Sequence, residues 1–232
     1  MKILAIDTSA VCASVAVTEN GRILSESSVN TGLTHSRTLM PMIDSTLKNA
    51  EISLDGIDCF ACSVGPGSFT GVRIGVAAVK GLCDGTGKKC MPVSTLEALA
   101  YNLSDRECIA VSVMDARCQQ VYCAVFKNEK GSVARLTEDS ALKIEDLGEK
   151  LKEYEGEIIF VGDGAEICHK ALGYKKAGAG NVYQRGSSVA FAAEKNYGEE
   201  KLLSAGELMP AYLRLPQAER ELKAKSLKKG DE

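Results

Sequence analysis

Polar side chains follow the first apolar segment of the chain, where they could bind a phosphate or a hydrated magnesium ion. Residues 3–6 predict a strand, and Asp7, Thr8 and Ser9 come directly after it. Open α/β sheets place ligands at the carboxyl ends of their strands, and an aspartate there can hold hydrated Mg²⁺. The alternative is a turn closed by Asx and Ser/Thr side-chain hydrogen bonds, which these residue types favour on their own.

A second candidate is the glycine-rich segment Gly65-Pro66-Gly67, which precedes an apolar helix predicted over residues 70–83. Glycines permit close approach of a backbone, and the free amides at a helix start attract anions. The segment lacks both the Gly-Lys-Ser/Thr of a P-loop and the GxGxxG of a dinucleotide site. A phosphate cradle and a purely structural start of the helix both fit this sequence.

The remaining reactive side chains form no recognisable catalytic or metal-binding set. His35 lies among serines and threonines at a helix start, which favours a capping or surface role, and His169 lies on a predicted solvated helix. Cys59 and Cys62 have redox-motif spacing, but they fall in a predicted strand, where they point to opposite faces. Zinc would need two further ligands. We therefore expect no catalytic residue, no metal site and cysteines that act as buried small hydrophobes.

The composition restricts the class of protein. The chain has 232 residues and a formal net charge of −3, whereas proteins that bind nucleic acid alone carry clustered cations. No apolar run approaches the roughly 20 residues that cross a bilayer, and the first residues lack a signal-peptide pattern. We expect a cytoplasmic protein without membrane contact and without disulfides, because cytosolic thiols stay reduced.

The chain repeats itself. Each half reads as meander, helix, strand, Gly-x-Gly and helix, so that Asp115 corresponds to Asp7, and Gly162 and Gly164 correspond to the first glycine pair. Chance similarity of two hairpins is the alternative. The repeat predicts a duplicated α/β fold with a cleft between two lobes, at residues 1–103 and 104–216, followed by a charged tail at 217–232. The last helix could return to the first lobe.

Several collinear motifs resemble the TsaB (YeaZ) family over residues 1 to about 215. They are MKILAIDTS, VGPGSFTGVRIG, VSTLEALA, VGDGA and PAYLR. The resemblance implies the actin, sugar-kinase and heat-shock-ATPase type of fold, which is ribonuclease H-like, with mixed sheets flanked by helices. It also implies a noncatalytic partner of TsaD, with TsaE as an ATPase of the same assembly. That assembly makes N6-threonylcarbamoyladenosine next to the anticodon of tRNAs that read ANN codons.

One segment departs from the catalytic paralogue. The corresponding segment of TsaD resembles V-N-H-L-E-x-H, in which two histidines on one helix face bind metal. This chain has Thr95 and Leu99 in place of those histidines. Leucine cannot ligate a metal. The resemblance thus implies that the metal belongs to TsaD and that this chain requires no cofactor, although Asp7 and the glycine segments could still bind ATP or ADP weakly.

The resemblance also implies how the partner binds. The helices predicted at 34–50 and 70–83 would pack against the equivalent pair of TsaD, and the same face would form a homodimer when TsaD is absent. The tRNA would be bound through the complex. The helix at 70–83 is apolar almost all round, so its own fold or a partner must bury more than one side of it. The expected contact residues are Leu39, Met42, Val72, Arg73, Val76, Val79 and Lys80.

Two other functions compete with this one. The first is an enzyme in its own right, either an actin-like ATPase or phosphotransferase or a glycoprotease-like enzyme. A phosphotransferase would need an aspartate in the cleft, for which Asp7, Asp115 and Asp163 are candidates, but none lies in a distinctive motif. The second is independent RNA binding, which the charge disfavours.

Overall fold

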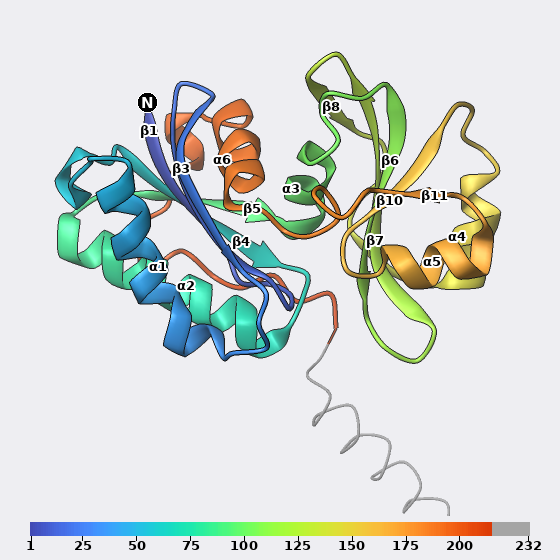
Figure 1. Ribbon diagram of the computed structural model, residues 1–232, viewed down its shortest axis with the longest axis horizontal. Coiled ribbons are helices and arrows are strands. Elements are labelled where there is room, and N and C mark those ends of the chain that lie inside the picture. The colour runs from blue at the N-terminus through green and yellow to red at the C-terminus, as the bar shows by residue number, and fades with distance from the viewer. Residues whose placement is uncertain (215–232) are drawn as a thin grey trace, which may run out of the picture.

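A computed structural model describes residues 1–214 of the chain (Figure 1). The charged tail predicted at 217–232 lies outside the described residues. Two β-sheets lie next to each other, and each is flanked by helices (Figure 1). Helix and strand bounds follow from the apolar patterns of the sequence, and the sheets carry most of the buried side chains.

The first sheet has the strand order β3-β2-β1-β4-β5. Its first three strands form an antiparallel meander, and the last two run parallel to β1. Asn20 and Gly21 form the tight turn of the meander with φ of 49° and 75°, as the Asn-Gly pair predicts. The strands are β1 (Lys2–Asp7), β2 (Ala13–Glu19), β3 (Arg22–Val29), β4 (Cys59–Gly65) and β5 (Cys90–Ser94).

The second sheet has the order β11-β10-β6-β7-β8, with β9 paired to β7. Its first strands again form an antiparallel meander, and β10 and β11 again run parallel to the first strand, β6. The predicted duplication and its two mixed sheets are therefore confirmed. The strands are β6 (Cys108–Asp115), β7 (Gln120–Glu129), β8 (Ser132–Arg135), β9 (Ser140–Lys143), β10 (Ile158–Val161) and β11 (Lys175–Lys176).

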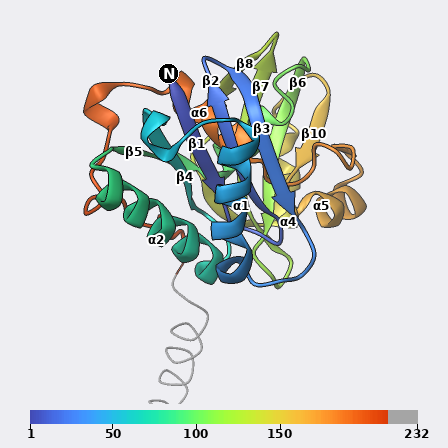
Figure 2. The same cartoon turned by 60° about the vertical axis from the view of Figure 1, so that its left-hand side comes forward.

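The helices form layers on both sides of the two sheets. In the first lobe α1 and α2 share one face of the sheet (Figure 2), and α6 covers the other. Helix α3 lies between the lobes and contributes to both cores, while α4 and α5 cover the outer face of the second sheet. The helices are α1 (His35–Asn49), α2 (Phe69–Thr86), α3 (Thr95–Tyr101), α4 (Ile144–Leu151), α5 (Ala165–Leu172) and α6 (Gly186–Lys195).

The chain returns to the first lobe after the second sheet. Helix α6 packs against β1 and β2. Beyond it, Leu203 and Cys90 exchange backbone hydrogen bonds, and the amide of Ala211 donates to the carbonyl of Val64 at 2.7 Å. The second sheet and its helices therefore end before Gly186, and the last described residues belong to the first lobe.

The predicted partner residues on α1 and α2 have a different role. Five of them, Leu39, Met42, Val72, Val76 and Val79, are at most 6% exposed and belong to the core of the first lobe. The prediction that these side chains are available to a partner is therefore wrong. The physical reason is that these five side chains pack on the sheet beneath the two helices, whereas Met40 on α1 stays 53% exposed. The outer side of α2 has small residues instead, including Ala77 and Gly81.

Glu26 on β3 fixes the start of α6. One carboxylate oxygen accepts hydrogen bonds from the amide and the hydroxyl of Ser187 at 2.9 and 2.7 Å, and the other accepts from Arg185 at 2.6 Å. Burial raises the pKa of Glu26, but the hydrogen bonds from Arg185 and Ser187 outweigh it, and the pKa lies below its ordinary value of 4.5. The ionised carboxylate therefore stabilises the fold.

We expect Glu26→Gln to lower the free energy of unfolding at pH 7 by about 2–3 kcal/mol, because it leaves Arg185 without its anionic partner. The contribution of Glu26 is complete above its ordinary pKa and is lost as the pH falls through the lower folded-state value. The difference between parent and variant, measured by urea unfolding, should thus shrink below about pH 4.5. The exposed Glu149→Gln is the control, and a pH-independent difference would contradict the assignment.

Candidate functional site

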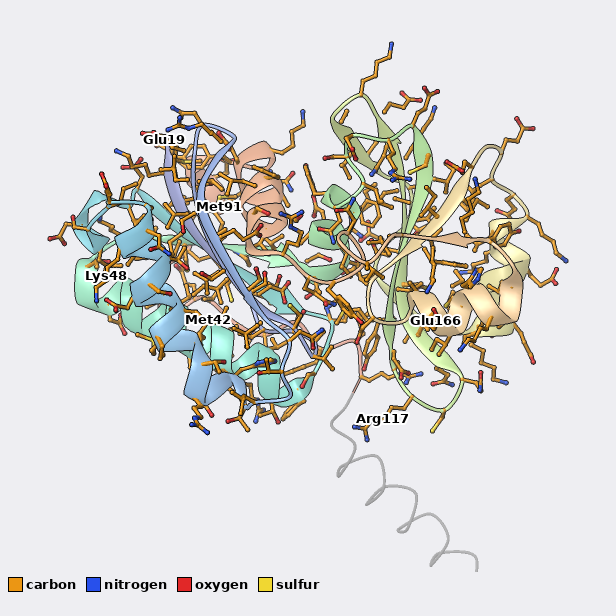
Figure 3. All side chains as sticks on the ribbon, viewed as in Figure 1. Glu19, Met42, Lys48, Met91, Arg117 and Glu166 are labelled. Carbon is orange, nitrogen blue, oxygen red and sulfur yellow. The ribbon has the colours of Figure 1, made fainter. Side chains whose placement is uncertain are left out.

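A pocket of about 500 Å³ lies between the two lobes, where β1, β4 and β6 end. Both lobes and the last described residues of the chain form its wall. Arg117 lies at its rim on the loop that follows β6 (Figure 3). The lining residues are Ser9, Ala10, Val11, Pro66, Gly67, Ser68, Phe69, Thr70, Met114, Asp115, Ala116, Arg117, Tyr122, Asp163, Ala211, Tyr212, Leu213 and Arg214.

Asp7 does not face this pocket. Its side chain is 1% exposed, and it accepts hydrogen bonds from the amide and hydroxyl of Ser9 at 2.8 and 2.6 Å and from the hydroxyl of Ser63 at 2.5 Å. Burial raises the pKa of the carboxyl, against these hydrogen bonds. The predicted role in facing a phosphate or a metal is wrong for Asp7, because internal donors occupy both oxygens. The Asx-type turn is the alternative that the structure adopts.

Thr8 is buried as well, and only Ser9 of this trio lines the pocket. The hydroxyl of Thr8 donates to the carbonyl of Gly71 at 2.8 Å, which ties the end of β1 to the first turn of α2. The prediction that Thr8 faces a phosphate is therefore also wrong. The end of β1 mainly anchors α2.

Gly67, just before α2, and Gly71, in its first turn, allow two backbones to lie against each other. A Cβ at Gly67 would lie 2.4 Å from the carbonyl oxygen of Ser9, and a Cβ at Gly71 would lie 2.1 Å from that of Thr8. Pro66 and Gly67 do line the pocket, but Gly65 does not. The structural start of a helix, rather than an open phosphate cradle, is therefore what this segment forms.

The second lobe repeats this packing. A Cβ at Gly162 would lie 2.1 Å from the carbonyl oxygen of Val113, and Gly164 lies against Met114 and Asp115. Neither glycine lines the pocket, which corrects their predicted position, whereas Asp115 and Asp163 do line it. Of the aspartates singled out in the sequence, the structure thus brings together the pair from the second lobe and keeps Asp7 apart.

Asp163 is the most perturbed acid of the pocket. Burial, followed by the charge of Asp115, raises the pKa of Asp163 to about 6. Its oxygen Oδ1 is buried and has no hydrogen-bond partner among residues 1–214. Its ionised form therefore costs free energy at neutral pH.

We expect Asp163→Asn to raise the free energy of unfolding at pH 7.5 by about 2–3 kcal/mol, since each pKa unit corresponds to about 1.4 kcal/mol. Because the folded-state pKa of Asp163 is raised, the parent protein becomes more stable as the pH falls through about 6 and the carboxyl is protonated. The difference in free energy of unfolding between the variant and the parent should therefore be smaller at pH 5 than at pH 7.5. Urea unfolding at both values measures it, with the exposed Asp44→Asn as control. A destabilised Asp163→Asn protein would refute the burial argument.

Some of the residues that the sequence offered for a nucleotide, namely Asp7 and the glycines beside it, do not fit a magnesium-bound phosphate. Asp7 is enclosed by internal donors, and the glycines beside it hold backbone carbonyls at distances that leave no room for an anion. Ser68 accepts a hydrogen bond from the amide of Gly71 and thus caps α2 itself. Weak binding of ATP or ADP stays a prediction, and Asp7 and these glycines would not be its ligands.

The histidines and cysteines have structural roles. His35 Nε2 lies 2.7 Å from the carbonyl oxygen of Ala10, and His169 Nδ1 lies 2.8 Å from that of Tyr174. Eight cysteines are buried, as predicted, but Cys118 is exposed on the loop after β6. Burial raises the pKa of Cys59 to about 12. Over residues 1–214, no three acidic, histidine or cysteine side chains group as metal ligands would, and no helix has the length and apolarity to span a membrane.

Thr95 and Leu99 lie on α3. Both are at most 1% exposed. Leu99 belongs to the core of the second lobe, and the hydroxyl of Thr95 is buried without a hydrogen-bond partner in the described part of the chain. These side chains contribute to packing between the lobes and do not line the pocket.

Sequence reasoning missed Phe69, Tyr212 and Arg214 at the pocket rim, and it assigned Arg73 to a partner surface. The rings of Phe69 and Tyr212 stack at 4.7 Å, and Arg73 Nε donates to the hydroxyl of Tyr212 at 2.7 Å. Arg214 reaches the opposite lobe and donates to the carbonyl of Ala116 at 3.3 Å. The PAYLR motif was the available signal, but its partners are distant in sequence.

Comparison with known proteins identifies the family. A family model described as TsaD, tRNA N6-adenosine threonylcarbamoyltransferase, matches residues 29–222. The tRNA threonylcarbamoyladenosine biosynthesis protein TsaB of Bacillus subtilis is 31% identical over 94% of this chain and 96% of its own length. That of Escherichia coli is also 31% identical, over 97% and 100%. The chain belongs to the TsaB family.

Two further comparisons differ in how much of the chain they cover. A tRNA N6-adenosine threonylcarbamoyltransferase from Chelativorans is 36% identical, but only over 31% of this chain and 20% of its own length. YeaZ from Pseudomonas aeruginosa superimposes with a TM-score of 0.80 at 25% identity, over 91% of this chain and 99% of that one. The two TsaB proteins and YeaZ thus match over 91% or more of this chain, whereas this threonylcarbamoyltransferase matches over 31% of it.

Proposed function

We propose that this chain takes part in threonylcarbamoyladenosine biosynthesis in tRNA as a noncatalytic subunit that binds and supports TsaD. The transfer would modify the adenosine next to the anticodon of tRNAs that read ANN codons. The full-length match to TsaB proteins of that name supports the pathway. TsaE would join the same assembly, and tRNA would bind through the complex rather than to this chain alone.

The observation that carries the noncatalytic role is the packing of α3. Thr95 and Leu99 occupy the positions at which TsaD would have its histidine pair, and both are enclosed in the core. Two ligands on one helix face need an open coordination site for catalysis. Apolar packing at these positions instead supports a lobe arrangement that is fixed and metal-independent. The transfer chemistry would then take place in TsaD.

The binding surface that we propose is the outer face of α1 and α2, not the buried stripe. Ala77 and Gly81 on α2 are exposed and small, and a Cβ at Gly81 would meet no atom within 4 Å. Small residues let another helix approach closely, and Met40 on α1 is 53% exposed and offers an apolar contact. A helix pair of TsaD would pack here, and a second copy of this chain would occupy the same face in the absence of TsaD.

Size-exclusion chromatography with light scattering tests the proposal. This chain and TsaD of the same organism, mixed at equal concentrations, should elute together as a heteromer, and this chain alone should elute as a homodimer. Separate elution at micromolar concentration would overturn the binding role. The competing enzymatic role predicts ATP hydrolysis by the isolated chain, and turnover that purified Asp163→Asn protein lacks would favour that role instead.

A further inference from the structure

The last described residues cross the pocket from one lobe to the other. Residues 208–214, here called the strap, begin in the core of the first lobe, where Leu208 is fully buried. The amide of Ala211 then donates to the carbonyl of Val64 at the end of β4, at 2.7 Å. Figure 1 shows this red segment running towards the gap between the two sheets. The strap is thus attached to the first lobe through both backbone and side chain.

Tyr212 forms the second attachment. Its ring stacks on Phe69 with the centroids 4.7 Å apart and the planes at 28°. Its hydroxyl accepts a hydrogen bond from Arg73 Nε at 2.7 Å, and the guanidinium of Arg73 lies 3.7 Å from the centroid of Phe69. Stacking and cation–π contacts of this kind favour one relative orientation of their groups. The first turns of α2 therefore determine the direction in which the strap leaves the first lobe.

Arg214 connects the strap to the second lobe. Its Nη1 donates to the carbonyl of Ala116 at 3.3 Å, its Nη2 donates to the side-chain oxygen of Gln120, and its guanidinium lies 5.7 Å from the centroid of Tyr122. The amide of Ala116 in turn donates to the carbonyl of Gln120 at 2.9 Å, so the loop that Arg214 contacts is itself closed. An arginine fork is suited to hold two acceptors at a fixed angle.

Gly65 shows independently that the strap shapes the chain around it. Its φ of 120° lies in the region that side chains rarely adopt, and a Cβ there would lie 2.4 Å from the carbonyl oxygen of Ala211. A backbone oxygen cannot move aside as a side chain can. The end of β4 is therefore compatible with the strap only if residue 65 is glycine.

We propose that residues 208–214 are an interlobe strap that fixes the two lobes at one angle and keeps the pocket at one size. Helix α3 packs into the cores of both lobes, and Ala10 of the first lobe joins the core of the second. The strap adds a further junction at the pocket, through the contacts of Arg214 with Ala116 and Gln120. The strap thus gives a structural role to the PAYLR motif, which the proposed function does not use. With the strap in place, the two lobes move as one rigid body and do not open and close.

Two measurements on the full chain test the strap. Amide exchange by NMR reports its attachment: in the double variant Tyr212→Ala/Arg214→Ala, the Ala211 amide should exchange about tenfold faster or more, which corresponds to about 1.4 kcal/mol in the free energy of opening. Spin labels report the lobe angle. They are placed at Lys48→Cys on α1 and Lys170→Cys on α5, which are highly exposed, in a Cys118→Ser background. Figure 3 labels Lys48 and, on the same helix as Lys170, Glu166.

The expected result is a narrow distance distribution in the parent and a broad one in the double variant. Tyr197→Ala, which changes an exposed tyrosine outside the strap, should leave both readouts unchanged and serves as the control. Gly65→Ala should broaden the distribution without altering any strap side chain. If the Ala211 amide loses protection while the distance distribution stays narrow, the strap is a surface attachment only, and the proposal is overturned. An unchanged Ala211 amide would overturn it as well.

Discussion

Val76→Glu is expected to unfold the chain. Val76 lies in the core between α2 and the first sheet and is 4% exposed. The variant loses the packing of the valine and places a carboxylate among apolar side chains without a partner, at a combined cost of about 4–6 kcal/mol. That cost is comparable to the whole stability of many domains, which is about 5–15 kcal/mol. Circular dichroism should show lost structure or a steep fall in melting temperature.

Ala77→Glu is the matched control, because it introduces the same side chain one residue further along α2. Ala77 is exposed, and glutamate is a good helix former, so the cost should stay within about 0.5 kcal/mol. A Val76→Glu protein as stable as Ala77→Glu would show that the assigned burial of α2 is incorrect.

The second large effect concerns binding. If the outer face of α2 contacts TsaD, Ala77→Glu buries an unpaired charge in a helix–helix interface while leaving the monomer folded. Such a charge costs about 2–4 kcal/mol, so Kd for TsaD should rise by about 30- to 1000-fold. Isothermal titration calorimetry with purified TsaD measures the change. Light scattering should show that the homodimer of the isolated chain weakens in parallel.

Ala171→Glu provides the comparison for this prediction. Ala171 is exposed on α5, at the outer side of the second lobe, and the same substitution there changes net charge equally. It should bind TsaD with the affinity of the parent. Equal loss of affinity in both variants would assign the effect to charge alone, and full affinity of Ala77→Glu would place the contact on another surface.

The duplicated fold could be predicted because its signals are local. An Asn-Gly pair between alternating segments specifies a hairpin, and the same order of strand, aspartate, hairpin and Gly-x-Gly occurs twice. Both sheets have the predicted meander followed by parallel strands. Each of these features depends on neighbours within about 20 residues, which a single sequence contains.

The site could be predicted only in part, because its contacts are long-range. The carboxylate of Asp7 is enclosed by Ser63, which is 56 residues away, and Arg73 meets Tyr212 across 139 residues. Neither pairing can be recognised from the spacing of residues along the sequence. The apolar pattern of α2 was compatible both with a partner surface and with a deep core, and only the sheet beneath it decides between them. Of the residues predicted to face a ligand, Ser9, Pro66, Gly67 and Asp115 do line the pocket.

Reconstituted tRNA modification tests the central claim most directly. TsaD, TsaE, the threonylcarbamoyl-adenylate synthase, threonine, bicarbonate, ATP and a tRNA that reads an ANN codon are incubated with and without this chain. N6-threonylcarbamoyladenosine is then quantified by mass spectrometry. We predict that the modified nucleoside forms with the parent chain and with Ala171→Glu, and that its yield falls to background without the chain or with Ala77→Glu. Equal yields with and without the chain would contradict its role as the subunit that supports TsaD.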